Sequence, residues 1–246
     1  MYYKIYGEKK YTYITTVDSK TLSYTFKSPV NGKVMCYIVK AVNSDSVSSY
    51  LAKCMTYAQA PKVTLSNSRK GVLLEWKANK SAAGYWIYRK APGAKYWTRI
   101  ACVTKNYYTD KTAKSGTAYL YTVKVYTGKV LSGCNQDGWK IKHLSAPVVA
   151  SVVNGYGNVT CTWKAVPGAK SYEVYRKTDK DSTWRRVGTT TGVVYKDKNV
   201  TSLTKYSYIV KAISDKYVSS TSATAKSTKY LAAPVVSISN STSGVY

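Results

Sequence analysis

Acidic and imidazole side chains are scarce in this 246-residue sequence. It has 38 Lys and Arg residues against 11 Asp and Glu, and a single histidine, so its formal net charge is +27 at pH 7. General acid–base catalysis and metal binding draw mainly on His, Asp and Glu. None of the common catalytic signatures, such as GxSxG, HExxH or a phosphate-binding loop, is present. The sequence therefore predicts no enzyme activity, no cofactor and no metal centre; His143 has no second ligand at metal-binding spacing.

Long apolar runs and helical patterning are also missing. No apolar stretch of about 18 residues occurs, so the sequence predicts no membrane span. No segment places apolar residues on one helical face over two turns. Phe26 is the only phenylalanine, whereas the chain has 26 Tyr and 6 Trp.

The sequence repeats itself with a period of about 87 residues. Trp163 follows Trp76 by 87 positions, and the segment SYEVYRK at 171–177 matches GYWIYRK at 84–90. The dipeptide Ala-Pro recurs at 60–61, 146–147 and 233–234. A fixed period of this kind indicates an array of similar units, with the Ala-Pro pairs at their boundaries.

Within one unit the apolar residues alternate with polar ones. Val72, Leu74 and Trp76 alternate along one segment, and Tyr119 to Val125 alternate along another. Alternation with β-branched and aromatic residues predicts half-buried strands. Several short strands in under 90 residues favour an antiparallel two-sheet sandwich. We expect an all-β fold of tandem sandwiches.

These features resemble the fibronectin type III module, an immunoglobulin-like sandwich found in tandem on bacterial surface and secreted proteins. The resemblance rests on the Pro that opens each unit, on the Trp motifs, and on the segments YWTRIA at 96–101, YYTD at 107–110 and SGTAYLYTVKV at 115–125. It implies that Trp76 and Trp163 lie in the cores. It also implies that Tyr119 and Tyr206 clamp the corner before a strand.

The resemblance divides the chain into four parts. Residues 60–145 and 146–232 are expected to be complete modules, 1–59 a partial module beginning at its third strand, and 233–246 the first strands of a further one. The partial module has Met35 at the corner Tyr position and would leave Tyr3, Ile5, Tyr37 and Val39 partly uncovered. Either truncation of a longer protein or strand exchange with a neighbouring chain accounts for such ends.

The family resemblance implies a non-catalytic spacer or adhesion segment of a larger bacterial cell-surface or secreted protein, located outside the cell beside flanking domains of the same polypeptide. An alternative is a binding module for a glycan or an anionic cell-wall polymer. A third is nonspecific nucleic-acid binding, because the charge attracts any polyanion. Only 6 of the 38 basic residues are Arg, which argues against reading of base sequence.

One group of aromatic residues has two interpretations. As a ligand platform on one exposed sheet face, it would consist of Trp86, Tyr88, Trp97, Lys124 and Tyr126. The equivalent residues of the next unit are Glu173, Tyr175, Trp184, Lys211 and Ile213, so the platform is not repeated faithfully. As a structural feature, Trp97 and Trp184 would instead stack on Arg89 and Arg176, each eight positions earlier.

The five cysteines fit neither a zinc site nor a CxxC redox motif. Cys161 takes the place of Leu74 in the preceding unit and is expected in the core. Cys36 and Cys54 flank a hairpin. A register slip of one residue would put them on opposite faces, so the sequence leaves their pairing open.

Overall fold

The computed structural model describes residues 1–128, 130–241 and 244–245, and these residues form strands and loops without a helix. It divides into two compact units. The first comprises 1–64, 74–108 and 120–140, and the second comprises 65–73, 109–119 and 141–246. The sheets nevertheless follow the 87-residue repeat. The repeat boundaries at 60, 146 and 233 stay a prediction.

The first repeat consists of one antiparallel sheet. Its order is β2 (Thr12–Tyr13), β1 (Tyr2–Ile5), β3 (Val34–Ile38) and β4 (Lys53–Thr56). Cys36 lies directly opposite Cys54 in the β3–β4 pair, and the two form a disulfide. Met35 and Ile38 are buried, Tyr3 and Tyr37 are half-buried, and Val39 is 60% exposed. Val39 lies just beyond the end of β3.

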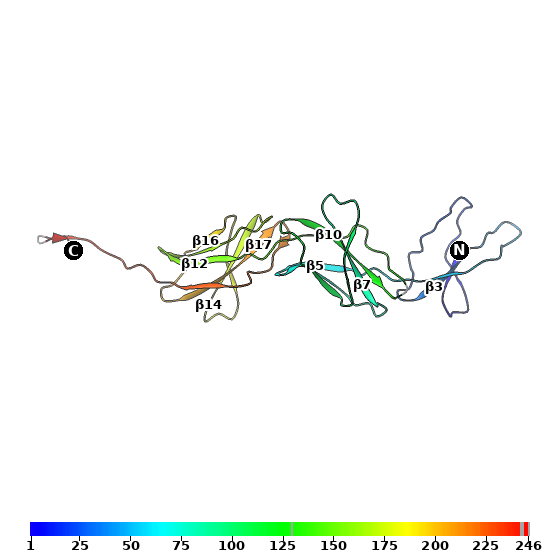
Figure 1. Cartoon of the computed structure of the whole chain (residues 1–246), viewed down its shortest axis with the longest axis horizontal. Coiled ribbons are helices and arrows are strands. Elements are labelled where there is room, and N and C mark those ends of the chain that lie inside the picture. Colours follow the sequence, from blue (N-terminus) through cyan, green and yellow to red (C-terminus); the bar gives the residue numbers. More distant parts are fainter. Residues whose placement is uncertain (129, 242–243, 246) are drawn as a thin grey trace. The chain divides into compact units, whose positions relative to one another are not determined.

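The second repeat has two sheets (Figure 1). One has the order β5 (Val63–Ser68), β6 (Gly71–Trp76) and β9 (Tyr107–Asp110). The other has the order β11 (Trp139–Lys142), β10 (Ala118–Tyr126), β7 (Gly84–Lys90) and β8 (Thr98–Val103). Trp76 is only 5% exposed and packs edge-on against Tyr85, with the ring centroids 5.1 Å apart.

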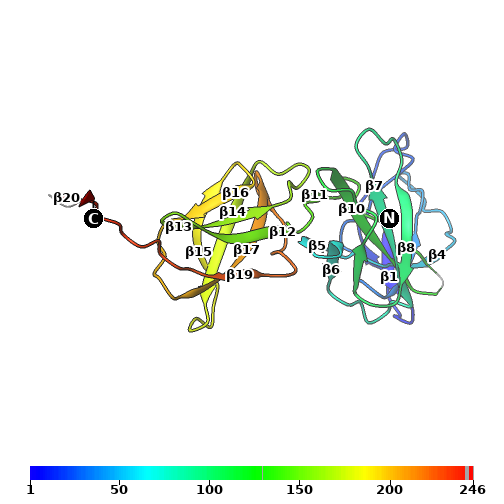
Figure 2. The same cartoon turned by 60° about the vertical axis from the view of Figure 1, so that its left-hand side comes forward.

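The third repeat has the same arrangement. One sheet has the order β12 (Val149–Gly155), β13 (Asn158–Trp163) and β16 (Val194–Asp197). The other has the order β15 (Arg185–Thr190), β14 (Ser171–Thr178), β17 (Lys205–Ser214) and β18 (Tyr217–Val218), and β19 (Lys226–Lys229) also pairs with β17. Figure 2 shows these strands in green, yellow and orange. The all-β tandem sandwich predicted from the sequence is confirmed.

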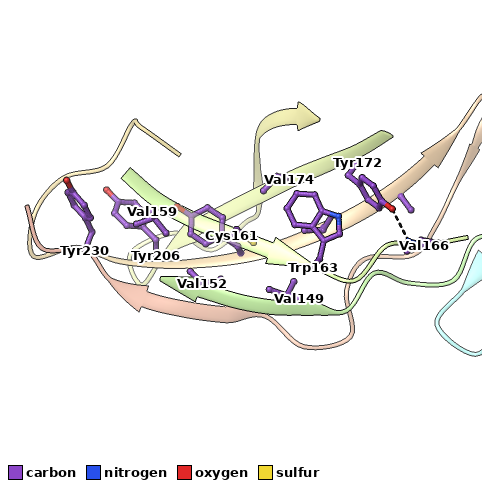
Figure 3. Packing of buried hydrophobic residues seen from close by; sticks show 13 residues of the cluster. Val149, Val152, Val159, Cys161, Trp163, Val166, Tyr172, Val174, Tyr206 and Tyr230 are labelled. Carbon is purple, nitrogen blue, oxygen red and sulfur yellow. Dashed lines mark hydrogen bonds between the residues drawn. The ribbon is translucent and has the colours of Figure 1, made fainter. Parts of the chain in front are cut away.

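The core of the third repeat lies between its two sheets (Figure 3). Trp163 is 3% exposed and meets Tyr172 edge-on at 5.3 Å between centroids. The Tyr172 hydroxyl accepts a hydrogen bond of 2.9 Å from the Val166 N–H. Cys161 is fully buried among these residues, and this burial raises the pKa of its thiol to about 12. The predicted core positions of Trp163 and Cys161 are confirmed.

The corner tyrosines are also where the resemblance placed them. The Tyr119 hydroxyl accepts a hydrogen bond of 3.2 Å from the Lys114 N–H, and the Tyr206 hydroxyl accepts one of 2.9 Å from the Thr201 N–H. In each case the side chain reaches back five residues and satisfies a backbone donor of the loop before its own strand. The loop is thereby tied to the sheet.

A buried carboxylate joins the two sheets of the third repeat. Asp197, at the end of β16, is 2% exposed and pairs with Arg176 of β14 at 2.6 Å. Its carboxylate also accepts a hydrogen bond of 2.8 Å from the hydroxyl of Tyr208 on β17. Burial and this hydrogen bond raise the pKa of Tyr208. The second repeat has Arg89, Asp110 and Tyr121 at the positions 87 residues earlier.

The segment after the third repeat differs from the expectation. No strand forms over 232–239, and Val235 and Ile238 are 98% and 71% exposed. Two short strands follow and pair with each other, β20 (Asn240–Ser241) and β21 (Gly244–Val245). An extended strand needs a partner for its backbone groups, and no described segment pairs with 232–239. Residues 242–243 and 246 of the expected further module lie outside the described residues.

Replacing Trp163 by Ala should lower the free energy of unfolding by about 3–5 kcal/mol, because it leaves a cavity in the core. Urea denaturation followed by circular dichroism measures this loss. Trp184→Ala serves as the matched control, since Trp184 is half-buried and lies outside the core cluster. Equal losses for the two variants would contradict the assignment of Trp163 to the core.

Candidate ligand-binding face

The outer face of one sheet of the second repeat gathers four of the five predicted platform residues. On β7, Tyr85 and Ile87 are buried. Because side chains alternate along a strand, Trp86 and Tyr88 point to the opposite face. On β10, Lys124 lies directly opposite Trp86, and Tyr126 follows two residues later on the same face. All four are half-buried.

A layered contact forms the centre of this face. The rings of Trp86 and Tyr126 stack with centroids 5.9 Å apart and an interplanar angle of 30°. The guanidinium carbon of Arg99, on β8, lies 4.5 Å from the centroid of the Trp86 ring. The Tyr126 hydroxyl donates a hydrogen bond of 2.9 Å to the Gly128 carbonyl. We call Trp86, Tyr88, Arg99, Lys124 and Tyr126 the aromatic face.

Tyr88 and Lys124 make the second contact of the aromatic face. The Lys124 ammonium lies 5.5 Å from the centroid of the Tyr88 ring, within the range of a cation–π contact. Burial raises the pKa of Tyr88, and the nearby Arg99 charge opposes that shift. Tyr88 is therefore a neutral phenol near pH 7, able to donate a hydrogen bond.

Trp97 precedes β8, at one edge of the sheet, and its ring packs against Gly138, which precedes β11 at the other edge. Gly138 has a φ of +69°, and a β-carbon there would lie 2.6 Å from the Trp97 ring. The glycine therefore makes room for the indole. The place of Trp97 in the ligand platform stays a prediction.

Arg99 is the member that sequence reasoning missed. A β-bulge between Ile87 and Tyr88 shifts the register of the β7–β8 pair so that Arg99 lies opposite Tyr88. The third repeat has a bulge at the equivalent place, and there Arg186 lies opposite Tyr175. Bulges re-aim side chains. The 87-residue spacing of the two arginines was the available signal.

The same face of the third repeat contains a carboxylate. Glu173 takes the place of Trp86 and forms an ion pair of 2.9 Å with Arg186. It also accepts a hydrogen bond of 2.7 Å from the Tyr175 hydroxyl. The Tyr175 and Arg186 hydrogen bonds lower the pKa of Glu173 against the opposing effect of burial. The Lys211 ammonium lies 4.9 Å from the centroid of the Tyr175 ring. The equivalent contact of the second repeat, between Lys124 and Tyr88, is 5.5 Å.

The predicted stacking of Arg176 on Trp184 is wrong. The Arg176 guanidinium instead pairs with Asp197 and lies 4.9 Å over the Tyr206 ring, while Lys177 lies 5.2 Å over Trp184. The reason is that the buried Asp197 carboxylate needs a cation, since an uncompensated buried charge costs far more than an exposed cation–π contact contributes. The stacking of Arg89 on Trp97 stays a prediction.

The aromatic face combines aromatic rings with cations that are unpaired among the described residues. Within 1–128, 130–241 and 244–245, neither Arg99 nor Lys124 forms an ion pair. The same residues contain no cluster of three or more His, Cys, Asp or Glu that could hold a metal. The face thus offers flat rings and two cations. None of the described segments is a helix long and apolar enough to cross a bilayer.

His143 is a structural residue. It is 5% exposed, and its Nδ1 lies 2.9 Å from the Asn67 side-chain oxygen. The same oxygen accepts a hydrogen bond of 3.2 Å from the Leu144 N–H. Burial lowers the pKa of His143, and the Asp110 charge partly opposes this. The imidazole therefore joins two segments of the second unit.

No family model matches the sequence. Exoglucanase B of Cellulomonas fimi is 31% identical over 180 residues, and Amylopullulanase of Thermoanaerobacterium saccharolyticum is 33% identical over 76 residues. The aligned parts make up 64% and 29% of this chain but only 15% and 6% of those proteins. The chain thus spans a small part of the length of either relative.

Two solved structures illustrate the structural comparison. The FN1-FN3 domains of chicken CNTN1 have 14% identity and a TM-score of 0.37, with 94% of this chain and 90% of that chain covered. A two fibronectin type-III domain segment from chicken tenascin has 18% identity and a TM-score of 0.37, with 70% of this chain and 99% of that chain covered.

The His143 environment predicts a specific loss of stability in acid. Because the pKa of His143 is lowered by folding, its neutral form is favoured in the native state. Stability is therefore intact above the unfolded pKa of about 6.5 and falls as pH drops through and below that value. Urea denaturation at pH 7.5 and pH 5 should show a larger loss for the native chain than for His143→Gln. An equal loss in both proteins would contradict this assignment.

Proposed function

We propose that this chain, a tandem of fibronectin type III sandwiches, is a non-catalytic spacer segment of a larger extracellular bacterial polypeptide whose other domains flank it. The observation that carries the proposal is that the core residues of the repeats are more alike than the residues on their surfaces. Core residues recur at a spacing of 87 positions, as with Trp76 and Trp163 or Tyr119 and Tyr206. The outward residues recur only in part, since Glu173 and Ile213 stand where the second repeat has Trp86 and Tyr126. A framework repeated more faithfully than its surface is what a structural role requires.

The relatives support placement beside enzyme domains. Both carry names of polysaccharide-degrading enzymes, and each matches this chain over a small fraction of its own length. A segment shared in this way behaves as an accessory part of a multidomain polypeptide. In this proposal the catalytic chemistry belongs to the flanking domains, because the chain lacks paired acids and an activated nucleophile.

The Cys36–Cys54 disulfide supports a location outside the cell. Disulfides form and persist in oxidising compartments and are rare in the cytosol. The bond closes a loop with a sequence separation of 18 residues in the repeat that consists of a single sheet. A cross-link of this length stabilises by about 3 kcal/mol in the chain-entropy account, which suits the one repeat without a second sheet.

The aromatic face favours a second function, binding of a glycan. The specific observation is the stack of Trp86 on Tyr126 beside the Tyr88–Lys124 pair. Flat rings pack against the apolar face of a sugar ring, and Lys124 supplies hydrogen bonds to its hydroxyl groups. Anionic cell-wall polymer remains a further proposed partner, attracted by the net charge of +27. Nucleic acid would be bound only through such nonspecific, salt-sensitive attraction.

A fusion experiment separates the spacer from the binding module. The chain is placed between a cellulose-hydrolysing domain and a cellulose-binding domain, and hydrolysis of insoluble cellulose is measured. A spacer should work equally well in its native form and with Trp86 and Tyr126 both replaced by Ala. The control is hydrolysis of a soluble substrate, which should not change. Loss of activity on insoluble cellulose in the double variant alone would contradict the spacer role, and turnover by the isolated chain would contradict the non-catalytic one.

A further inference from the structure

We infer that the aromatic face binds a polysaccharide whose sugars carry carboxylates, with Arg99 as the carboxylate-binding residue. The inference rests on the glycan-binding function proposed above and names the class of ligand. It comes from comparing the same face in two repeats of one chain. The two faces share an arginine, a tyrosine and a lysine at matched positions, Arg99, Tyr88 and Lys124 in the second repeat.

The third repeat contains the carboxylate that the second lacks. Glu173 binds Arg186 through its Oε1 at 2.9 Å and accepts the Tyr175 hydroxyl through its Oε2 at 2.7 Å. An arginine and a tyrosine in this arrangement therefore bind a carboxylate with both of its oxygens. In the second repeat Trp86 replaces Glu173. The donors are retained there, and no carboxylate of the described residues pairs with Arg99.

The contact between Arg99 and Trp86 leaves the donors of Arg99 available. The indole covers one face of the guanidinium, with the Arg99 guanidinium carbon 4.5 Å from the Trp86 ring centroid. The N–H groups of a guanidinium lie in its plane and form a fork that matches the two oxygens of a carboxylate. Stacking therefore fixes the orientation of Arg99 without using its hydrogen bonds. Arg99 is exposed and forms no ion pair among the described residues.

The rest of the face suits a sugar rather than a peptide side chain. The stacked Trp86 and Tyr126 rings lie next to the guanidinium, and in this inference the apolar part of the stack contacts a pyranose ring. Lys124 lies opposite Trp86 on the neighbouring strand and adds a second positive charge. A uronic acid residue places an apolar ring face and a carboxylate within one sugar. A polysaccharide of such sugars would contact the Trp86 and Tyr126 stack with a sugar ring and Arg99 with a carboxylate.

The test is titration of the full chain with a galacturonic acid oligosaccharide at about 150 mM salt, followed by tryptophan fluorescence and calorimetry. Arg99→Gln should weaken binding about tenfold or more, the usual loss for a charge-assisted hydrogen-bond pair. Trp86→Glu should abolish binding, since it supplies the internal carboxylate of the third repeat. The matched control is Arg186→Gln, which removes the same charge at the equivalent position and should change binding less than about twofold.

Each other outcome overturns the inference in a distinguishable way. Equal weakening by Arg99→Gln and Arg186→Gln would mean that the ligand responds only to net charge. Binding of a neutral glucan oligosaccharide, unaffected by Arg99→Gln, would refute the carboxylate but keep the proposed glycan-binding function. Binding of polyphosphate with the same dependence on Arg99, and none of the uronate, would assign the face to a phosphodiester polymer. Absence of binding to any of these would refute both proposals.

Discussion

The geometry of the third repeat depends on the ion pair and the hydrogen bond that the buried Asp197 carboxylate forms. The carboxylate lies at the end of β16 in one sheet, and its partners Arg176 and Tyr208 lie on β14 and β17 of the other. Removing one partner of such a group leaves an unpaired buried charge, which costs several kcal/mol. The two sheets are therefore held in one register relative to each other. The Arg176 guanidinium also donates a hydrogen bond of 2.6 Å to the Asn199 carbonyl, so the following loop is fixed as well.

This internal framework leaves the outer face of the sheet free to vary. Arg176 is committed to Asp197, and the residues that point outward from β14 and β17 do not contribute to the core cluster. Glu173 in the third repeat and Trp86 in the second occupy the same position with different chemistry, and each contacts the arginine that both repeats share, Arg186 or Arg99. Exchange of one for the other alters a half-exposed contact, which contributes about 1 kcal/mol or less. The fold can thus be repeated while its surface differs.

The sequence predicts the parts of this structure that follow from alternation along one strand. Alternation predicted the strand that contains Trp76, and the family resemblance placed Trp76 and Trp163 in the cores and Tyr119 and Tyr206 at the corners. Contacts that depend on register between strands could not be predicted. The Cys36–Cys54 pair needed the β3–β4 register.

The aromatic face, too, could be predicted from the sequence only in part. Trp86, Tyr88, Lys124 and Tyr126 lie at alternating positions of two paired strands, so the pattern placed them together. Arg99 joins them only because of a bulge, which alternation does not reveal. The contact of Trp97 with Gly138 joins segments far apart in the sequence, and alternation does not reveal it either. The partner of Arg176 lies on a different sheet, and no local pattern indicates it.

Grafting the aromatic face onto the third repeat tests the separation of framework and face most directly. The double variant Glu173→Trp with Ile213→Tyr gives the third repeat all five side-chain types of the aromatic face, since Tyr175, Arg186 and Lys211 are already in place. Calorimetric titration with the galacturonic acid oligosaccharide, combined with urea denaturation of the same protein, should give two sites per chain instead of one and a free energy of unfolding within about 1 kcal/mol of the native chain. A stoichiometry that stays at one, or a loss of several kcal/mol, would contradict this account.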